Sequence, residues 1–347
     1  MRQINSSVFV LDEKYATTRR LTQNQPVIDC KLENKIQTQL FIPANDSRKG
    51  EGGLRTQGYF KTDIEKLPLI TVITVVFNGE NCLEETILNI IGQTYHNIEY
   101  IIIDGGSTDG TLDIIRRYEN QIDYWISEDD KGIYDAMNKG IMAATGKWIN
   151  FMNAGDYFYK DTAVADVVND LEKSGEYTYY YGNHEVRYFE DSLRRIVDVA
   201  PCDDDLWRGL FFSHQTAFVT AEACKLYKFD VSIKLASDFD FFVKLQADRL
   251  KTKKINKTIS SISASGVSDT QRDAVFREYI LILLKYKEIS KIKIYLYFYT
   301  KVLVFFIKRF IKDNFPKFSN YIFSYIGFVA QIDQIKQTFG NNKQTLK

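Results

Sequence analysis

The chain has 347 residues, enough for one large domain with additions or for two modest domains, and its 45% hydrophobic content is that of a packed globular protein. Its four cysteines, Cys30, Cys82, Cys202 and Cys224, are scattered without paired or metal-ligand spacing, which argues against a disulfide framework. The formal net charge of zero conceals an asymmetry: residues 101–170 hold 13 Asp/Glu against 6 Lys/Arg, whereas residues 281–320 hold 9 Lys/Arg against 2 Asp/Glu.

Residues 1–66 are polar and show little periodicity, so they predict an extension that wraps a core or stays partly mobile. From Leu69 onward, apolar runs rich in β-branched residues alternate with helical patterns in units of roughly 30 residues. The predicted strands cover 69–78, 98–104, 122–127 and 147–153, and the predicted helices cover 79–94, 107–119 and 132–146. This alternation predicts an α/β fold with a mainly parallel, doubly wound sheet flanked by helices.

After Asp161 the pattern loosens. Residues 177–189 and 194–200 predict strands at a mixed sheet edge, and residues 236–246 predict a helix. From Glu278 the chain is helical, basic and aromatic to about Phe328. The predicted division is therefore an extension at 1–66, an α/β domain at 67–270 and a helical C-terminal region at 271–347.

Four polar groups follow the four predicted strands: Phe77–Gly79, Asp104–Ser107, Glu128–Tyr134 and Asn153–Asp156. Each alone could be an ordinary turn, because Asn, Asp and Gly suit turns for backbone reasons. Ligands in such sheets bind beyond the carboxyl ends of the strands, so four groups in succession predict a site. The GxGxxG fingerprint is absent after the first strand, which argues against a dehydrogenase.

The predicted site is acidic, so a diphosphate would bind there only with a bridging divalent cation. Mg²⁺ commonly uses one or two carboxylates together with substrate phosphates. Asp156 is the candidate ligand, since it ends the turn after the fourth strand.

Four motifs, "TVVFNG", "IIIDGGSTDGT", "SEDDKGIYDAMNKG" and "ATGKWINFMNAGD", occur in this order within residues 69–160. Together they resemble family 2 glycosyltransferases of the GT-A fold, above all bacterial enzymes of capsule, exopolysaccharide and colanic-acid-type assembly. The resemblance extends weakly to "HQTAFV" and "ASDFDFFVKL". It implies an inverting transferase that moves a hexosyl or N-acetylhexosaminyl group from a nucleotide-diphosphate donor, by family habit a UDP-sugar, to a saccharide or lipid-linked acceptor.

The resemblance also implies roles for particular residues. Asp238 matches the catalytic base, which takes the proton of the acceptor hydroxyl, and Asp156 matches the segment that holds the metal, Mg²⁺ or Mn²⁺, and the donor diphosphate. The predicted nucleotide-binding residues are Val76, Phe77, Asn78, Asp104, Gly106 and Lys131. The predicted donor or acceptor pocket comprises Tyr134, Asp135, Asn138, Asn153, Ala154, Gly155, His214 and Gln215.

Several of these residues have a second interpretation. Tyr134, Asp135 and Asn138 share a helix face by spacing, and they either line the sugar pocket or anchor the helix end. His214 is either a pocket residue or a buried, hydrogen-bonded histidine. Asp238 stands at a predicted helix start, where a carboxylate also favours the helix dipole.

The sequence departs from the family at two places. Many members have Asp-x-Asp-Asp where this chain has Asn153 to Asp156, so two carboxylates are missing, and Met137 stands where an Arg is common. We therefore predict a reduced metal site, with a plain turn as the alternative. Lys131 and His214 could supply phosphate-binding charge instead.

Residues 291–315 are apolar and aromatic but interrupted by basic residues, including Lys301, Lys308 and Lys312. The basic residues fall on about one third of a helical wheel, a pattern typical of a helix that lies in the membrane interface. We predict that residues 285–315 contact the inner face of the cytoplasmic membrane, with packing on the protein core as the alternative. Because the N-terminus lacks an apolar core typical of a signal peptide, we expect a cytoplasmic protein.

Two other functions remain open. A non-catalytic protein that binds a sugar or a partner would fit the thinned acidic motif. A sugar nucleotidyltransferase would need a glycine-rich, basic phosphate loop after the first strand, and "VVFNGEN" is not one. Nucleic-acid binding has little support, because the basic residues lie within an apolar helix.

Overall fold

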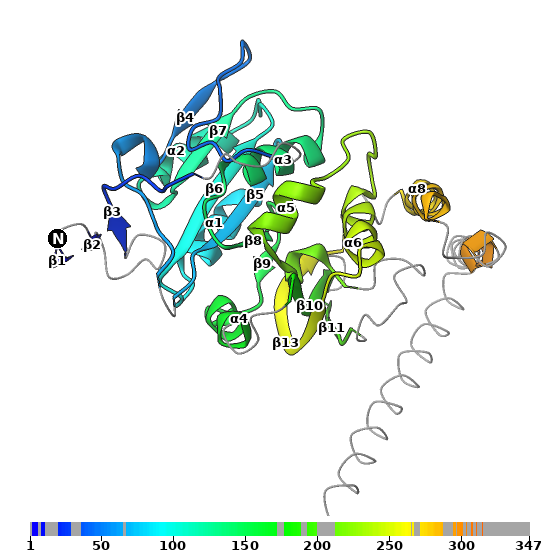
Figure 1. Cartoon of the computed structure of the whole chain (residues 1–347). Helices are drawn as coiled ribbons and strands as arrows, with labels where there is room; N and C mark the ends of the chain where they lie inside the picture. Colours follow the sequence, from blue (N-terminus) through cyan, green and yellow to red (C-terminus); the bar gives the residue numbers. More distant parts are fainter. Residues whose placement is uncertain are drawn as a thin grey trace, which may run out of the picture. The chain divides into compact units, whose positions relative to one another are not determined.

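The structure of the chain is a computed structural model (Figure 1). It describes residues 2–5, 8–10, 20–28, 36–64, 67–171, 177–188, 193–199, 212–264, 266, 271–286, 294–295, 297–300, 303, 307, 310 and 314. The chain divides into two compact units, Met1–Tyr286 and Lys287–Lys347, and each is described by itself. The sheet and the candidate site lie in the first unit.

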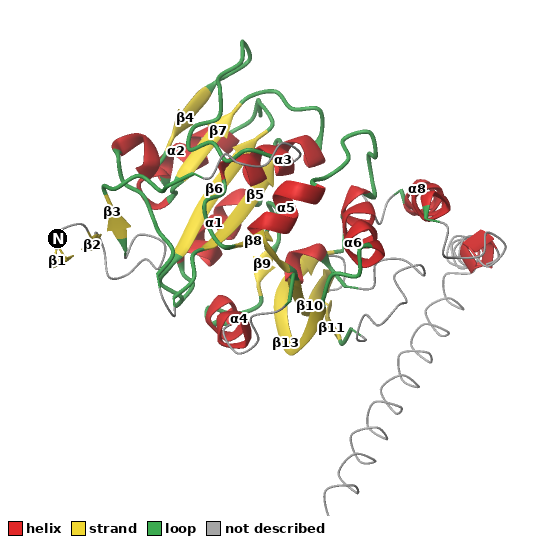
Figure 2. Cartoon of the chain, in the orientation of Figure 1, coloured by secondary structure: helices red, strands yellow, loops and turns green. Residues whose placement is uncertain are grey.

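Ten strands of the first unit form one mixed sheet (Figure 2). They are β4 (Gly50–Gly52), β5 (Ile70–Val76), β6 (Ile98–Asp104), β7 (Tyr124–Ser127), β8 (Trp148–Phe151), β9 (Tyr157–Phe158), β10 (Tyr179–Tyr188), β11 (Leu193–Val197), β12 (Phe218–Thr220) and β13 (Thr252–Ser263). Their order is β4-β7-β6-β5-β8-β12-β10-β13-β9, with β11 paired to β10. The central strands β7, β6, β5 and β8 run parallel, which confirms the predicted α/β sheet.

The helices cover both faces of this sheet. They are α1 (Leu83–Ile91), α2 (Thr111–Arg117), α3 (Ile133–Ala143), α4 (Ala163–Leu171), α5 (Ala221–Tyr227), α6 (Ser237–Ala247) and α8 (Arg272–Lys285), with short 3₁₀ turns η2 (Leu54–Gln57), η3 (Glu119–Gln121) and η5 (His214–Thr216). Apolar side chains of α1, α2 and α4 form one core cluster with Val72. The next residue, Ile73, points to the other face, where a Cβ on Gly140 of α3 would lie 2.5 Å from it. Helices α5 and α6 follow α3 on that second face through successive contacts.

Coverage on both faces explains the composition of the central strands. Every residue of β5 and β6 is buried, and both strands are rich in Ile and Val. Parallel strands that are buried on two sides read as continuous apolar runs rather than alternating ones. The polar groups of the chain are thereby left to the strand ends, where the loops begin.

Part of the predicted extension belongs to this sheet. Strand β4 pairs antiparallel with β7 at one sheet edge, with Gly50 opposite Ser127. Arg55 donates to Glu99 at 2.6 Å, and Lys61 donates to Asp123 at 2.9 Å, all four side chains being buried. Strands β1 (Arg2–Asn5), β2 (Val8–Val10) and β3 (Leu21–Thr22) form a separate three-stranded sheet.

At the other end, α8 packs on α6 within the first unit, so this unit continues beyond the predicted boundary at residue 270. The Phe239 and Tyr279 ring centroids lie 4.1 Å apart, and the Glu278 carboxylate accepts hydrogen bonds from the backbone N–H groups of residues 234 and 235. The predicted division of the chain at residues 66 and 270 remains a prediction.

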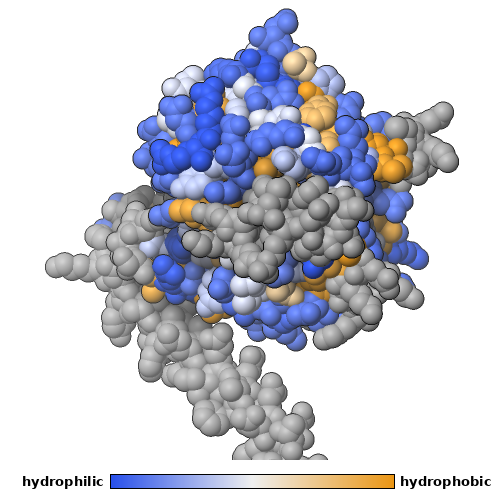
Figure 3. All heavy atoms as spheres, turned by 90° about the vertical axis from the view of Figure 1, so that its left-hand side faces the viewer, coloured by the Kyte–Doolittle hydropathy of each residue, from blue (hydrophilic) through white to orange (hydrophobic). Residues whose placement is uncertain are grey.

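Most of the predicted membrane segment, residues 285–315, lies outside the described residues, and this includes Lys301, Lys308 and Lys312. Its described residues are helical, and Tyr299 and Phe310 are exposed. No helix among the described residues is long and apolar enough to cross a membrane. On the face shown in Figure 3, hydrophilic residues predominate and the coloured hydrophobic atoms form only small groups.

Candidate active site

The loops after β5 and β6 are joined side by side at the carboxyl edge of the sheet. The backbone N–H of Asn78 donates to Ser107 Oγ at 2.7 Å, and the side-chain Oδ1 of Asn78 accepts from the N–H of Thr108 at 2.9 Å. Phe77, directly after Val76 at the end of β5, is 64% exposed. An exposed aromatic ring beside a fixed backbone is a suitable surface for a planar base.

Asp104 ends β6 and is fully buried. Its carboxylate accepts hydrogen bonds from Ser127 Oγ at 2.6 Å, from the N–H of Ser107 at 3.0 Å and from Ser107 Oγ. These bonds fix the carboxylate between the ends of β6 and β7. Asp104 therefore orders the loop that follows it, and its oxygens already have protein donors.

Gly106 needs its lack of a side chain. Its φ is +82°, and a Cβ there would lie 2.6 Å from Asp129 Oδ1. Lys49, from the segment before β4, donates from Nζ to the Gly106 carbonyl at 2.6 Å. The loop after β6 thus meets the acidic loop after β7 on one side and the extension on the other. Burial raises the pKa of Asp130 in that acidic loop, and the neighbouring carboxylates add to the rise.

A second cluster surrounds Asp238, at the N-terminus of α6. Its Oδ2 lies 3.3 Å from His214 Nδ1, and its Oδ1 accepts from the Tyr134 hydroxyl at 3.2 Å. On its other side, His214 Nε2 lies 3.2 Å from Asn153 Nδ2. With the amide nitrogen as donor, Nε2 accepts and Nδ1 carries the proton toward Asp238, which is the neutral tautomer. The Asp238 side chain is 18% exposed, so it can reach a ligand.

The three predicted residues of α3 have different contacts. Tyr134 reaches Asp238, and burial followed by the charge of Asp238 raises the pKa of its hydroxyl. Asp135 accepts a hydrogen bond from the N–H of Lys131 at 3.0 Å, and Lys131 is exposed. Both amide atoms of Asn138 bond the backbone of Phe229, at 2.9 and 3.0 Å. Only Tyr134 of these three contacts the Asp238 cluster in the described part of the chain.

The turn after β8 presents Asp156 to the same cluster. Gln215 Nε2 donates to its Oδ2 at 2.6 Å, and the N–H of Ser263 donates to its Oδ1 at 3.1 Å. Gly155 has a φ of +90°, and the N–H of Ala154 bonds the Val75 carbonyl at 3.3 Å. Burial raises the pKa of Asp156 above its ordinary value, and the two hydrogen bonds oppose the rise only in part.

The donor set at Asp156 does not form a resident metal site. The carboxylate is nine-tenths buried, and both of its oxygens accept hydrogen bonds from uncharged groups. Among the described residues, no three His, Cys, Asp or Glu side chains converge as metal ligands. One carboxylate fits a cation only where a bound diphosphate supplies further ligands, as Mg²⁺ sites in nucleotide enzymes often do.

Most of the predicted residues fall into two neighbouring clusters, whereas Lys131, Asp135 and Asn138 belong to neither. The first, at the ends of β5 and β6, contains Val76, Phe77, Asn78, Asp104 and Gly106. The second, around Asp238, contains Tyr134, Asn153, Ala154, Gly155, Asp156, His214 and Gln215.

Three contributors to the site, Ser127, Lys49 and Arg187, are not among the predicted residues. Ser127 is the residue opposite Asp104 in the β6–β7 register, and the shared strand ends could have indicated it. Lys49 and Arg187 had no comparable signal, since each lies far along the chain from the loop it contacts. Arg187 donates to the Gly155 carbonyl of the turn after β8.

The chain is similar to known proteins in sequence and in fold. The model of the family described as "Glycosyl transferase family 2" matches residues 71–234. An uncharacterized glycosyltransferase of Mycobacterium tuberculosis (strain ATCC 25618 / H37Rv) is 38% identical over 184 residues, covering 51% of this chain and 68% of the relative. TuaG of Bacillus subtilis (strain 168), a teichuronic acid biosynthesis glycosyltransferase, is 31% identical over 115 residues. This match covers 32% of this chain and 46% of TuaG.

Two solved structures resemble the chain. TarS 1-349 of S. aureus in complex with UDP-GlcNAc has a TM-score of 0.52 at 17% identity, covering 71% of this chain and 74% of that one. The mannosyltransferase PcManGT of Pyrobaculum calidifontis, in complex with GDP-Man and Mn²⁺, has a TM-score of 0.51 at 18% identity, covering 65% of each chain. At such identity the likeness shows the fold alone, and it confirms the predicted GT-A architecture.

Proposed function

The chain belongs to glycosyl transferase family 2, and from this premise we propose that it transfers a sugar from a UDP-sugar to a saccharide or lipid-linked acceptor with inversion at the anomeric carbon. The transferred group would be a hexosyl or N-acetylhexosaminyl unit, and the product a bacterial surface polysaccharide. TuaG, a relative named for teichuronic acid biosynthesis, and TarS, solved with UDP-GlcNAc, support these choices.

One observation carries the proposal: a partly exposed carboxylate, Asp238, is held in place by His214 and Tyr134. In the proposed reaction Asp238 accepts the proton of an acceptor hydroxyl. The hydroxyl oxygen then forms a bond to the anomeric carbon while the bond from that carbon to the UDP oxygen breaks. A positioned base contributes typically 10²–10⁴-fold to such a step.

His214 and Tyr134 act in this scheme as positioning residues. Each donates one hydrogen bond to a different oxygen of Asp238, which fixes the carboxylate plane and leaves lone pairs for the acceptor. The side-chain amide of Asn153 contacts the second ring nitrogen of His214, Nε2. This contact favours the tautomer in which Nδ1 of His214 donates a hydrogen bond to Asp238.

The nucleotide binds in this proposal at the ends of β5 and β6. Phe77 faces the base, Val76 and Asn78 contact base and ribose, and the buried Asp104 orders the loop beside them. The interlocked loops around Asn78 and Ser107 support this placement, because they present a preformed surface at the carboxyl edge.

A divalent cation, Mn²⁺ or Mg²⁺, would be held by Asp156 together with the phosphates of the donor. Its chemistry would be to neutralise charge on the departing diphosphate. Burial raises the pKa of Asp156, which works against the charged carboxylate that a cation needs. Affinity for the cation alone should therefore be low, and the exposed basic side chain of Lys131 would add a phosphate contact.

The C-terminal segment 285–315 places the enzyme, in this proposal, at the inner face of the cytoplasmic membrane. Its basic residues would contact anionic lipid, and its exposed aromatic side chains, Tyr299 and Phe310 among them, would enter the interface.

The experiment that tests this function compares Asp238→Asn with Asp240→Asn. UDP release from UDP-hexoses and UDP-N-acetylhexosamines is measured with a bacterial membrane extract as the acceptor source. Asp238→Asn should lower turnover by about 10²–10⁴-fold while UDP binding persists, since a neutral amide cannot take the proton. Asp240 is buried and paired with Lys244 at 2.6 Å, so its variant should lose stability but keep turnover per folded molecule.

Equal turnover in Asp238→Asn and the wild type would contradict the assignment of the base. Donor binding without turnover in the wild type would favour a non-catalytic protein. Pyrophosphate release from a nucleoside triphosphate would identify a nucleotidyltransferase instead.

A further inference from the structure

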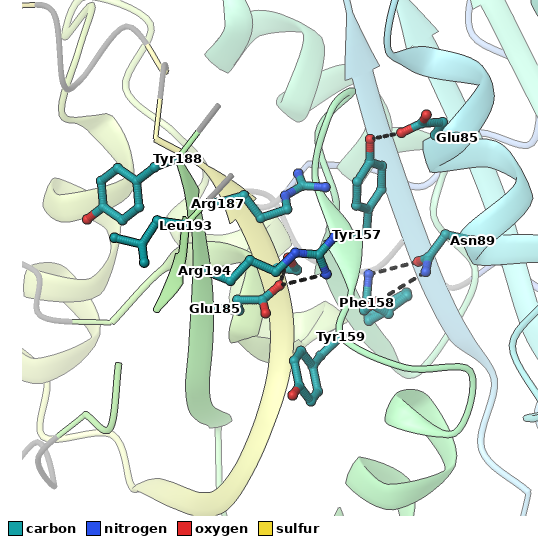
Figure 4. A pocket seen from close by; sticks show the side chains of 11 residues that line it. Glu85, Asn89, Tyr157, Phe158, Tyr159, Glu185, Arg187, Tyr188, Leu193 and Arg194 are labelled. Atoms are coloured by element: carbon teal, nitrogen blue, oxygen red, sulfur yellow. Dashed lines mark hydrogen bonds and ion pairs between the residues drawn. The ribbon is translucent and has the colours of Figure 1, made fainter. Parts of the chain in front are cut away.

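A pocket of about 480 Å³ lies beside the turn after β8 (Figure 4). We call it the tyrosine–arginine pocket. Its size falls within the range of small-ligand sites. Its lining comes from α1, β9, β10, β11 and β13, and comprises Glu85, Asn89, Tyr157, Phe158, Tyr159, Glu185, Arg187, Tyr188, Leu193, Arg194 and Ser261.

This pocket is separate from the Asp238 cluster. Glu85 and Asn89 belong to α1, which covers one face of the sheet, whereas Asp238 begins α6 on the other face. The turn after β8 joins the two places: Gln215 contacts Asp156, and Arg187 donates to the carbonyl of the preceding residue, Gly155. A ligand in the pocket would therefore lie next to the turn proposed to hold the donor diphosphate.

The acidic side chains of the pocket are already engaged. Glu85 accepts from the Tyr157 hydroxyl at 2.5 Å, and Glu185 accepts from Ser261 Oγ at 2.6 Å. The guanidinium of Arg187 stacks on the Tyr157 ring, with 3.9 Å from Cζ to the ring centroid. Through these contacts the carboxylates of Glu85 and Glu185 already have hydrogen-bond partners, so neither needs one from a ligand.

Arg194 is the side chain of the pocket whose N–H groups can still donate to a ligand. It is 70% exposed, and its one ion pair among the described residues is a long one, 3.9 Å to Glu185. In Figure 4 the Arg194 and Arg187 guanidinium groups both lie between Glu185 and Tyr157. Two guanidinium groups favour a planar anion such as a carboxylate, which they can bind through paired hydrogen bonds.

Exposed apolar surface surrounds these charges. Tyr159 is 40% exposed, Tyr188 is 39% exposed and Leu193 is 55% exposed. Tyrosine rings pack against the C–H faces of sugar rings while their hydroxyls bond sugar oxygens, since the side chain has an apolar body and a polar end. Partly exposed tyrosines and an arginine in one pocket thus match a sugar ring that carries an acidic group.

We propose that the tyrosine–arginine pocket binds an acidic sugar unit of the saccharide acceptor, at a distance from the hydroxyl that reacts. The assignment as acceptor rests on the proposed function, whereas the binding of an acidic saccharide rests on the pocket alone. Arg194 contacts the carboxylate of the sugar, and Tyr159 and Tyr188 contact its ring. The pocket would select chains that already contain such a unit.

The test measures saccharide binding by isothermal titration calorimetry to the full chain at low ionic strength, without nucleotide. The probes are a hexasaccharide of alternating glucuronate and N-acetylglucosamine, the uncharged hexamer of N-acetylglucosamine, and inorganic phosphate. The acidic hexasaccharide should bind saturably and at least fivefold more tightly than the uncharged hexamer. Arg194→Ala should weaken it about tenfold, the value of one charge-assisted contact.

Arg116→Ala is the matched control. Arg116 is also exposed, at 51%, and has a long ion pair, 3.5 Å to Asp113, but it lies on α2 away from the pocket. Binding unchanged in Arg116→Ala and weakened in Arg194→Ala, at equal melting temperature, supports the proposal. Tyr159→Ser supplies a second variant, which should weaken both hexasaccharides because it removes ring contact rather than charge.

Three results would overturn the proposal: no saturable binding of the acidic hexasaccharide, equal binding by Arg194→Ala, or full competition by phosphate at the same concentration, which would show an anion site only. The measurement is repeated in Asp238→Asn, where binding should persist. Failure of the donor site therefore leaves this result intact, and failure of the pocket leaves donor binding intact.

Discussion

At the scale of single residues, the two histidines near the site are held in different ways. His214 has a partner at each ring nitrogen, Asp238 and Asn153. His184, on β10, is 8% exposed, and its Nδ1 has no hydrogen-bond partner among the described residues. Burial lowers the pKa of His184 from 6.5 to about 4, so the folded protein holds this ring neutral.

This burial predicts a loss of stability in mild acid. The unfolded chain binds a proton at His184 near pH 6.5, whereas the folded protein does so only near pH 4. The stabilising contribution is therefore complete above pH 6.5 and is lost as the pH falls toward 4, by up to roughly 3 kcal/mol. The variant His184→Gln, which cannot titrate, should show a flatter dependence in this interval.

Urea unfolding between pH 7.5 and 4.5 measures the effect. Wild type and His184→Gln should differ in slope, with the wild type losing more free energy of unfolding on acidification. Parallel pH profiles for the two proteins would show that His184 is not the titrating group.

The candidate site shows how far residue-level prediction extends. The resemblance implied that Asp238 is the base and that Tyr134, Asn153 and His214 belong to the donor or acceptor pocket. The structure brings these four side chains into a single hydrogen-bonded chain. Asn138 shares a helix face with Tyr134, yet its amide is used by the backbone of Phe229. Spacing on a helix gives the direction of a side chain, but the partner it meets depends on a segment about ninety residues away.

At the scale of elements, the extension is fixed to the sheet through Glu99. This buried carboxylate accepts from Arg55 at 2.6 Å, from Thr71 Oγ1 at 2.6 Å, and from the N–H and hydroxyl of Thr145. Its partners lower its pKa although burial opposes them. The segment that contains Arg55 therefore completes a buried ion pair of the core.

We expect Arg55→Met to destabilise the first unit by about 3–5 kcal/mol, because it leaves the Glu99 charge buried without its partner. The double variant Arg55→Met/Glu99→Gln should recover part of this loss, since the uncharged amide needs no counter-ion. Chemical unfolding of the three proteins measures both effects.

An exposed pair on α2, Arg116 with Asp113, provides the control, and Arg116→Met should cost less than about 1 kcal/mol. A similarly small cost for Arg55→Met would show that the extension does not depend on this ion pair.

Strands and helices whose residue pattern reflects burial were predicted correctly. A strand that depends on pairing with a neighbouring strand was not. The central strands β5 to β8 and the helices between them follow from apolar runs and helical spacing. Strand β4 was not predicted, because Gly50–Gly52 has neither alternation nor bulk. A two- or three-residue strand at a sheet edge is set by the neighbour it pairs with, here β7, and leaves no local trace.

At the scale of the whole molecule, acidic residues gather in the middle of the sequence and basic residues toward its C-terminal part. The acidic stretch 101–170 contains the loops of the candidate site, whereas the basic stretch 281–320 contains the predicted membrane segment. A neutral overall charge therefore hides two regions suited to different partners, a cation at the first and an anionic surface at the second.

The full chain should bind vesicles that contain 30% anionic phosphatidylglycerol and should bind neutral phosphatidylcholine vesicles weakly. Binding should fall between 50 and 500 mM NaCl, because salt screens the attraction of basic residues to the surface. Reversal of Lys301, Lys308 and Lys312 to Glu should abolish it. Cosedimentation measures the bound fraction.

Vesicle binding that is equal in the wild type and the triple variant would assign residues 285–315 to protein packing instead. Retained thermal stability of the triple variant is the necessary control, since a helix packed on the core would lose stability with these charges reversed.

The central claim is that a nucleotide-sugar donor binds at the carboxyl edge of the sheet with a cation at Asp156. It is tested most directly by the melting temperature with UDP, GDP or dTDP, each with Mn²⁺ or with EDTA. We expect UDP with Mn²⁺ at about 100 times Kd to raise it by roughly 5–10 °C. The rise should vanish in EDTA and in Asp156→Asn. No rise with any nucleotide, in folded protein, would contradict the account.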